Sequence, residues 1–305
     1  MTSLIFTPNA NQRAVIMNTG NKLKKFGLFA ALPLSIFAAV LIYPFAQGLF
    51  LTFTDWDGFK YEKFTGFANY TKSFHDPIFW STLRFTLIYV FVSLILINLV
   101  AFGLALLVTA KLRSSNVFRT FFFVPNLIGG VVLGVIWQFI FNTALVSISG
   151  KMGWSLFESS WLGETTTAFW ALIIVTVWQS SGYMMIIYIT GLISIEQDVL
   201  EAARVDGASA ARTLFSIKMP LMAQAFTISL FLTLRGGFMA YDVNVALTGG
   251  GPYRTTELIS MHIFQDAFAF GNFGTGQSKA VIMFIMVAVA ALVQVSVSKR
   301  MEVQR

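Results

Sequence analysis

Long runs of sequence without a charged side chain constrain the fold of this chain more than any other feature. An α-helix needs roughly 20 apolar residues to cross the hydrocarbon core of a bilayer, where only helices and closed barrels satisfy their own backbone hydrogen bonds. The chain is 56% hydrophobic and 11% charged, whereas soluble domains carry about 25% charged residues. The runs therefore predict an all-α integral membrane protein and exclude a soluble enzyme. They cover residues 26–54, 85–110, 120–150, 165–195 and 280–298.

A sixth candidate span, residues 222–240, is interrupted by Arg235. A charged side chain inside a span is tolerated where it faces other protein or a water-filled cavity, so this segment still counts as a span. The sequence thus predicts a polytopic fold with six transmembrane helices. The membrane domain is expected to comprise residues 26–298, between a tail of residues 1–25 and a tail of residues 299–305.

The Lys and Arg residues predict the orientation of these spans, because positive residues gather on the cytoplasmic side of membrane proteins. Most of them lie in the two tails and in the connections at residues 111–119 and 204–218. We therefore expect both termini in the cytoplasm and a multi-pass protein of the plasma membrane. Since the basic residues flank apolar runs, the net charge of +7 indicates topology and not a nucleic-acid partner.

The sequence offers no pattern of a metal site or of a catalytic site. It contains no Cys, and its two His residues, His75 and His262, stand apart without the spacing of a zinc site. Paired acid and base motifs and the G-x-S-x-G pattern of hydrolases are also missing from the sequence. We therefore expect no metal ligands and no catalytic residues in this chain.

The cytoplasmic connection at residues 194–220 has the pattern of two short helices. Ser194 and Gln197 form a capping box that predicts the start of the first helix, and Gly207 suits the position just after its end. Ser209 is the expected N-cap of the second helix, and Pro220 is expected to stop it. Such a pair is suited to docking on a soluble partner. An amphipathic connector on the membrane surface is the alternative.

The same connection carries a longer motif, in which Glu201-Ala202-Ala203 is followed at fixed spacing by Gly207, Ile217 and Pro220. This pattern resembles the EAA loop of the inner-membrane permease subunits of binding-protein-dependent ABC importers. Met219 replaces the Leu of the family pattern, which is a volume-conserving apolar change. The resemblance implies the fold of a type I ABC importer permease.

Two further stretches are similar to carbohydrate permeases of the maltose, lactose and glycerol-phosphate type. They are G-F-A-N-Y at residues 66–70, and Tyr241-Asp242 followed by T-G-G-G-P at residues 248–252. The resemblance covers nearly the whole chain from about residue 26. It is closest to the first of the two permease subunits that such importers use.

The resemblance also implies partners. Two cytoplasmic ATPase subunits would bind ATP and Mg, so this chain itself would bind no cofactor and would not be an enzyme. A second homologous permease subunit and an extracytoplasmic sugar-binding protein would complete the complex in the lipid bilayer. The residues expected to contact the ATPase subunits are Glu201, Ala202, Ala203, Asp206, Gly207, Ala208, Phe215 and Pro220.

For substrate contacts, the resemblance points to Ser180, Tyr183, Thr233, Gly237 and Ala240. Asp242 is added as a polar residue near the end of a span, where ionisable side chains are often functional. It follows Arg235 by seven residues, which is about two helical turns. The two are therefore expected on one helix face, as an ion pair or as separate substrate contacts.

Packing between helices is the alternative role for these positions, since small residues and hydroxyls are common at helix contacts in membranes.

The sequence thus predicts a transmembrane permease subunit of an ATP-driven ABC importer for a di- or oligosaccharide, which forms half of the translocation pathway by alternating access. Two alternatives remain at this point. One is a secondary transporter driven by an ion gradient, and the other is an ABC permease for a non-sugar solute such as glycerol phosphate.

Overall fold

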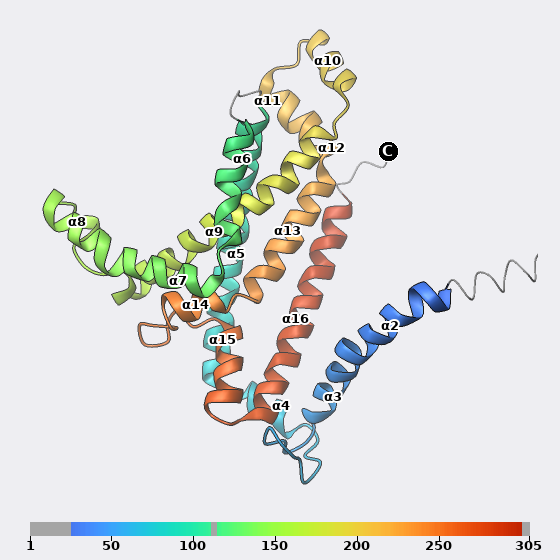
Figure 1. Ribbon diagram of the computed structural model, residues 1–305, viewed down its shortest axis with the longest axis vertical. Helices are drawn as coiled ribbons and strands as arrows, with labels where there is room; N and C mark the ends of the chain where they lie inside the picture. The colour runs from blue at the N-terminus through green and yellow to red at the C-terminus, as the bar shows by residue number, and fades with distance from the viewer. Residues whose placement is uncertain (1–25, 111–114, 301–305) are drawn as a thin grey trace, which may run out of the picture.

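A computed structural model describes residues 26–110 and 115–300 (Figure 1). The expected tail of residues 1–25 and the last residues of the C-terminal tail lie outside the described residues. Within the described ranges the chain is helical, with one isolated bridge between Thr54 and Phe64. Five helices are long and apolar enough to cross a membrane, or up to six if one bent pair counts as a span. The prediction of an all-α polytopic protein is confirmed.

The first span stands apart from the other helices (Figure 1). It runs through η1 (Gly27–Ala31), α2 (Leu32–Phe37), η2 (Ala38–Ile42) and α3 (Tyr43–Leu51). None of its 18 most hydrophobic consecutive residues is buried. Its contact with the bundle lies near its end, where the rings of Phe45 and Phe284 are 5.2 Å apart. This helix therefore presents apolar side chains on all sides.

Two long helices form the centre of the bundle. α5 (Pro77–Thr109) begins at Asp76, whose side chain accepts a hydrogen bond from the Ile78 N–H, with Pro at the first helical position. α9 (Thr165–Ile193) packs along it. α4 (Ala68–Phe74) lies beside the start of α16 (Phe273–Lys299), the last long helix. Buried apolar residues such as Val90, Leu172 and Val175 fill the α5–α9 contact.

The third apolar run does not form one helix, contrary to the prediction of a span over residues 120–150. α6 (Ser115–Phe123) ends at η3 (Val124–Leu127), which contains Pro125. A new helix begins at α7 (Gly130–Phe139) and continues through η4 (Ile140–Ala144) and α8 (Leu145–Met152). It turns sharply away from the bundle (Figure 1). Proline cannot donate the helical hydrogen bond, which explains the break. The short turns η5 (Ser155–Phe157) and η6 (Trp161–Gly163) lead into α9.

The sixth candidate span, predicted over residues 222–240, forms one helix, which is shorter than the other spans. α13 (Ala223–Phe238) has 16 residues, and it is bent by 71° from the preceding segment, Ala210–Leu221. It ends about halfway along α16 (Figure 1). α14 (Asp242–Leu247) runs in a new direction, and α15 (Ile259–Phe264) with η8 (Gln265–Ala269) completes the path to the start of α16.

The predicted arrangement of Arg235 and Asp242 on one helix face is therefore wrong, because the helix ends between them.

The cytoplasmic loop contains α10 (Gln197–Val205), α11 (Ala210–Arg212), η7 (Thr213–Lys218) and α12 (Met219–Leu221). Ser209 caps the second helix by accepting a hydrogen bond from the Arg212 N–H at 3.3 Å, as predicted. The predicted capping box is wrong: Ser194 ends α9, where its hydroxyl donates to the Gly191 carbonyl. Pro220 does not stop the second helix either, which passes through it and breaks at Met222.

Asn98 joins three helices through hydrogen bonds inside the membrane domain. Its Oδ1 accepts from the Tyr188 hydroxyl at 2.7 Å and from the Ser229 hydroxyl at 2.6 Å. Its Nδ2 lies 3.4 Å from the Thr233 hydroxyl. All four side chains are buried. In the apolar interior of a membrane, no water is present to form hydrogen bonds with these side chains if the bonds between them are lost.

We predict that Asn98→Leu lowers the free energy of unfolding by about 1–3 kcal/mol, because it leaves two buried hydroxyls without their acceptor. Asn116→Leu, at an exposed position of α6, is the control. Unfolding of each purified variant in mixed micelles, followed by circular dichroism, measures the difference. Equal loss of stability in both variants would contradict the role of Asn98.

Candidate functional site

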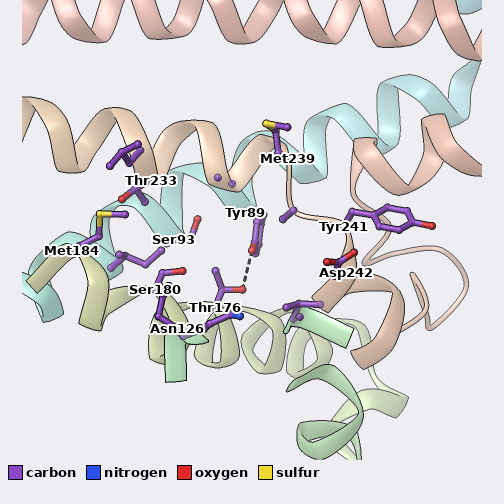
Figure 2. A pocket seen from close by; sticks show the side chains of 18 residues that line it. Tyr89, Ser93, Asn126, Thr176, Ser180, Met184, Thr233, Met239, Tyr241 and Asp242 are labelled. Carbon is purple, nitrogen blue, oxygen red and sulfur yellow. Dashed lines mark hydrogen bonds between the residues drawn. The ribbon is translucent and has the colours of Figure 1, made fainter. Parts of the chain in front are cut away.

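A cavity of about 360 Å³ lies inside the membrane domain, between α5, α9 and α13 (Figure 2). Residues of α7, η3 and the start of α14 complete its wall. The helix break after α13 contributes Met239, Ala240 and Tyr241, and the break before α7 contributes Asn126. The polar side chains that line it are Tyr89, Ser93, Asn126, Thr176, Gln179, Ser180, Thr233, Tyr241 and Asp242.

Hydrogen bonds hold some of these side chains in place. The hydroxyls of Tyr89 and Thr176 lie 2.9 Å apart and join α5 to α9 (Figure 2). The Gln179 amide donates to the Ile128 carbonyl at 3.1 Å, which ties α9 to the end of η3. Asp242 is exposed and is the charged residue of this wall. The cavity thus offers hydroxyl, amide and carboxylate groups beside apolar surface, a mixture typical of small-molecule sites.

The structure brings five of the six expected substrate residues to this cavity, namely Ser180, Thr233, Gly237, Ala240 and Asp242. Tyr183 is not among its lining residues, and its side chain is 41% exposed on α9. Ser180 and Met184 line the cavity from the same helix, and Tyr183 projects to one side of them.

Two neighbouring glycines of α13 differ in their surroundings. A Cβ on Gly237 would lie 3.0 Å from Cγ2 of Val90, so Gly237 allows α13 to approach α5 closely. This contact matches the packing role that the sequence left open. A Cβ on Gly236 would meet nothing within 4 Å, and Gly236 lines the cavity. Gly236 therefore leaves free space at the wall.

Sequence reasoning missed the contribution of Tyr89, Ser93 and Asn126. Tyr89 and Ser93 lie in an apolar run whose helical periodicity does not distinguish a cavity from a buried helix contact. Asn126 follows Pro125 directly, and a polar residue beside a helix breaker was the available signal for a break that lines a cavity.

The second candidate region is the cytoplasmic loop, which projects beyond the ends of the long helices (Figure 1). Glu201, Ala202 and Asp206 are exposed on or at the end of α10, whereas Ala203 is buried. Phe215 is 65% exposed on η7. Ala208 and Pro220 are half-buried. The loop thus combines exposed charge with exposed apolar surface, as protein interfaces do.

Gly207 sets the angle between the two helices of this loop. Its φ of 71° lies in the left-handed region. Ala208 N–H donates to the Ala203 carbonyl at 2.9 Å, and Gly207 N–H donates to the Arg204 carbonyl at 3.0 Å. The positive φ after the last helical turn and the Ala208-to-Ala203 bond are features of a Schellman cap, in which glycine is strongly preferred. The predicted position of Gly207 just after the first helix is confirmed.

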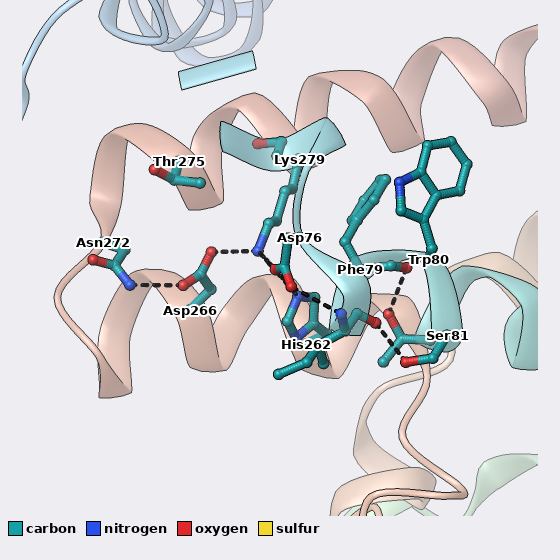
Figure 3. Close-up of polar contacts among 12 residues, drawn as sticks. Asp76, Phe79, Trp80, Ser81, His262, Asp266, Asn272, Thr275 and Lys279 are labelled. Carbon is teal, nitrogen blue, oxygen red and sulfur yellow. Dashed lines mark hydrogen bonds and ion pairs between the residues drawn. The ribbon is translucent and has the colours of Figure 1, made fainter. Parts of the chain in front are cut away.

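A buried ionic network lies at the opposite end of the molecule, where α5, α15 with η8, and α16 meet (Figure 3). Lys279, 2% exposed, lies with its Nζ 2.5 Å from Asp76 Oδ2 and 2.7 Å from Asp266 Oδ2. His262 Nε2 lies 3.1 Å from the same Nζ. His262 Nδ1 lies 3.3 Å from Glu257 Oε1. The interpretation of His262 as an isolated residue is therefore wrong.

These contacts act on the ionisation of the carboxyl groups. Burial works to raise the pKa of Asp76, but the hydrogen bonds from Lys279 and the Ile78 N–H outweigh it and lower the pKa below 3.8. Burial likewise opposes the hydrogen bonds from Arg254 and His262 to Glu257, whose pKa is lowered below 4.5. The network's contribution to stability is therefore present at neutral pH and is lost as the pH falls through these lowered values.

Comparison with known proteins gives one family for this chain. Residues 98–303 match the model of the "Binding-protein-dependent transport system inner membrane component" family. The chain is 41% identical over 281 residues to the probable starch degradation products transport system permease protein AmyD of Thermoanaerobacterium thermosulfurigenes. That match covers 92% of this chain and 95% of AmyD.

A second relative and a solved structure agree with this match. The multiple sugar-binding transport system permease protein MsmF of Streptococcus mutans is 30% identical over 276 residues, which cover 90% of this chain and 95% of MsmF. A chain in the crystal structure of a bacterial ABC transporter that imports the acidic polysaccharide alginate has the same fold. Its TM-score is 0.78 at 20% identity, over 93% of this chain and 99% of that chain.

We predict that Lys279→Met lowers the free energy of unfolding by about 3 kcal/mol, because Asp266 would stay buried, and Asp76 partly buried, without their cation. Lys60→Met is the matched control. Its ion pair with Glu62 is exposed, and such a pair contributes at most about 1 kcal/mol. Thermal unfolding in detergent at pH 7 compares the two, and equal melting temperatures would contradict the importance of the network.

Proposed function

Because the chain belongs to the family of inner membrane components of binding-protein-dependent transport systems, we propose that it is the permease subunit of an ATP-driven importer of a carbohydrate. The observation that carries this proposal is the cavity at the break after α13, which places hydroxyl, amide and carboxylate groups inside a multi-pass membrane protein. Those groups match the hydroxyls of a sugar as donors and acceptors.

The substrate is a di- or oligosaccharide on this proposal. Tyr89 and Met184 give the cavity wall aromatic and apolar surface, on which the faces of a sugar ring pack. The names of AmyD and MsmF refer to starch degradation products and to multiple sugars, which favours a sugar over glycerol phosphate. Ser180, Thr233, Gly237, Ala240 and Asp242 are the substrate-contacting residues.

A second homologous permease subunit forms the other half of the pathway. This is supported by the first span, whose side chains from Phe29 to Tyr43 are largely exposed. It is supported as well by the cavity, which is open on one side of α13, where Gly236 and Met239 are exposed. A membrane subunit that covers α13 would enclose the cavity.

Two cytoplasmic ATPase subunits supply the energy, with ATP and Mg bound on them. The loop of α10 and η7 docks on one of them, with Glu201 as the charged contact and Phe215 as the apolar contact. The rigid cap at Gly207 is suited to transmitting movement, because it fixes one helix against the other. Ala202, Ala203, Asp206, Ala208 and Pro220 complete this docking segment.

An extracytoplasmic binding protein delivers the sugar. One related structure holds the alginate transporter in complex with a periplasmic protein bound to an alginate pentasaccharide. A secondary transporter driven by an ion gradient is disfavoured, because the family of this chain is that of binding-protein-dependent systems. The exposed cytoplasmic loop also has no role in such a transporter.

We predict that Gly207→Val reduces ATP-driven uptake by about tenfold or more, because the left-handed conformation costs about 1–2 kcal/mol for a residue with a Cβ and the second helix would shift. Gly153→Val is the matched control: both glycines have a φ of 71° and open space around the Cβ position. Glu201→Ala is expected to lower uptake in the same direction.

Uptake is measured in proteoliposomes that contain the complete complex, with membrane insertion checked by detergent extraction. Equal uptake by Gly207→Val and Gly153→Val would overturn the coupling role of the loop.

We predict that Gly236→Leu blocks transport of oligosaccharides, because the new side chain would occupy the cavity without colliding with a neighbouring helix. Gly103→Leu on α5 is the control, since it is also exposed, helical and free of neighbours within 4 Å. We compare the uptake by the two variants and the natural chain. The labelled substrates are di- and oligosaccharides, a uronate oligosaccharide and glycerol phosphate. Unchanged oligosaccharide uptake by Gly236→Leu would place the pathway elsewhere.

A further inference from the structure

Arg235 is a charged residue inside the membrane domain that the proposed site does not yet use. It lies in the last turn of α13, 12 residues after Ala223, and thus about 18 Å along the helix axis. Since α13 ends about halfway along α16 (Figure 1), Arg235 lies at the level of the membrane interior. A charged side chain at this depth is costly unless it meets water or an oppositely charged partner.

The part of the chain that the structure describes does not provide that partner. Arg235 is exposed, and within residues 26–110 and 115–300 no hydrogen bond or ion pair joins it to another side chain. The expected partner, Asp242, belongs to α14 and follows a change of chain direction. Arg235 therefore faces something outside this fold.

The face of α13 that carries Arg235 borders the face that lines the cavity, and Arg235 itself is not among the lining residues. At about 100° per residue, Arg235 lies roughly 40° from Met239 and 60° from Leu232 around the helix. Both of these residues line the cavity, as does the adjacent Gly236. Lipid contact on this face would leave the cavity open to hydrocarbon, whereas a transport pathway along it would supply water to the guanidinium.

We propose that Arg235 is a specificity-determining residue of the transport pathway, where its guanidinium lies in water beside the cavity and donates hydrogen bonds to the hydroxyls of the sugar. Asp242, exposed on the cavity wall, is the complementary acceptor. A guanidinium offers a rigid fork of donors and a carboxylate offers acceptors alone, so the two together match the neighbouring hydroxyls of a neutral sugar. This inference rests on the proposed function.

The absence of Cys from the natural sequence makes a direct test available, because Arg235→Cys introduces a single thiol into the chain. The complete complex in proteoliposomes is treated with a charged, membrane-impermeant thiosulfonate reagent. We expect Cys labelling at position 235 and its suppression by a saturating concentration of the transported sugar. Leu292→Cys, at a 69% exposed position within the apolar span of α16, is the control and should not react.

The charge of the adduct provides the second readout. We expect sugar uptake by Arg235→Cys to fall about tenfold or more, as for loss of a charged hydrogen bond. A cationic aminoethyl adduct should restore much of the uptake, and an anionic sulfonatoethyl adduct should not. Arg84→Gln, which removes an exposed Arg of α5 outside the cavity, should transport like the natural chain.

Three results would overturn the proposal. No labelling of Arg235→Cys would place the residue against lipid. Labelling only after removal of the second permease subunit would show that Arg235 lies in the interface between the two subunits, as part of an ion pair. Labelling without protection by sugar, together with unchanged uptake, would remove it from the substrate path. Failure of the proposed function is distinguishable from these, because then the natural complex itself imports none of the sugars.

Discussion

The bilayer requires every backbone polar group in its core to be hydrogen-bonded within the protein. The rest of this structure depends on where the helices continue without interruption and where they are interrupted. Long uninterrupted helices, α5, α9 and α16, form the frame. The breaks lie at Pro125, at Met222 and after Phe238, and these three residues are buried against other parts of the protein. Two of these breaks line the same cavity, through Asn126 and the segment from Met239 to Asp242. The helix interruptions thus form part of the cavity wall in this fold.

Polar side chains stabilise the frame at two levels. Inside the membrane domain, Asn98 joins α5, α9 and α13 through Tyr188, Ser229 and Thr233. Thr233 belongs both to this group and to the cavity wall, so the position of the wall is tied to the packing of three helices. At the far end, Lys279 holds the starts of α5 and α16 together with η8. The cytoplasmic loop lies outside both clusters and is fixed mainly by its own cap at Gly207.

Much of the fold could be predicted from the sequence, because long apolar runs indicate membrane spans directly. The cap at Ser209 and the turn at Gly207 could also be predicted, since a local hydrogen bond and a positive φ restrict the residue type. The helix breaks were harder to predict. The run at residues 120–150 contains no charge, so hydropathy alone did not reveal that Pro125 divides it, and Arg235 and Asp242 seemed to share a helix that in fact ends at Phe238.

Contacts between distant segments were beyond sequence reasoning. His262 was interpreted as isolated because its partners are not its neighbours in the sequence: Lys279 follows it by 17 residues and Asp76 precedes it by 186, so they meet only in the folded state. The same holds for Asn98 and Tyr188. Among the expected substrate residues, the helix register brought Ser180 but not Tyr183 to the cavity, a difference of orientation that spacing within an apolar helix does not specify.

The source of energy for transport is the most direct test of this account. The complete complex is reconstituted into proteoliposomes with its binding protein outside, and accumulation of a labelled oligosaccharide is followed with ATP inside or with an imposed proton or sodium gradient. The account predicts accumulation that requires ATP and is insensitive to collapse of the ion gradients. Accumulation that follows an ion gradient in the absence of ATP would contradict it.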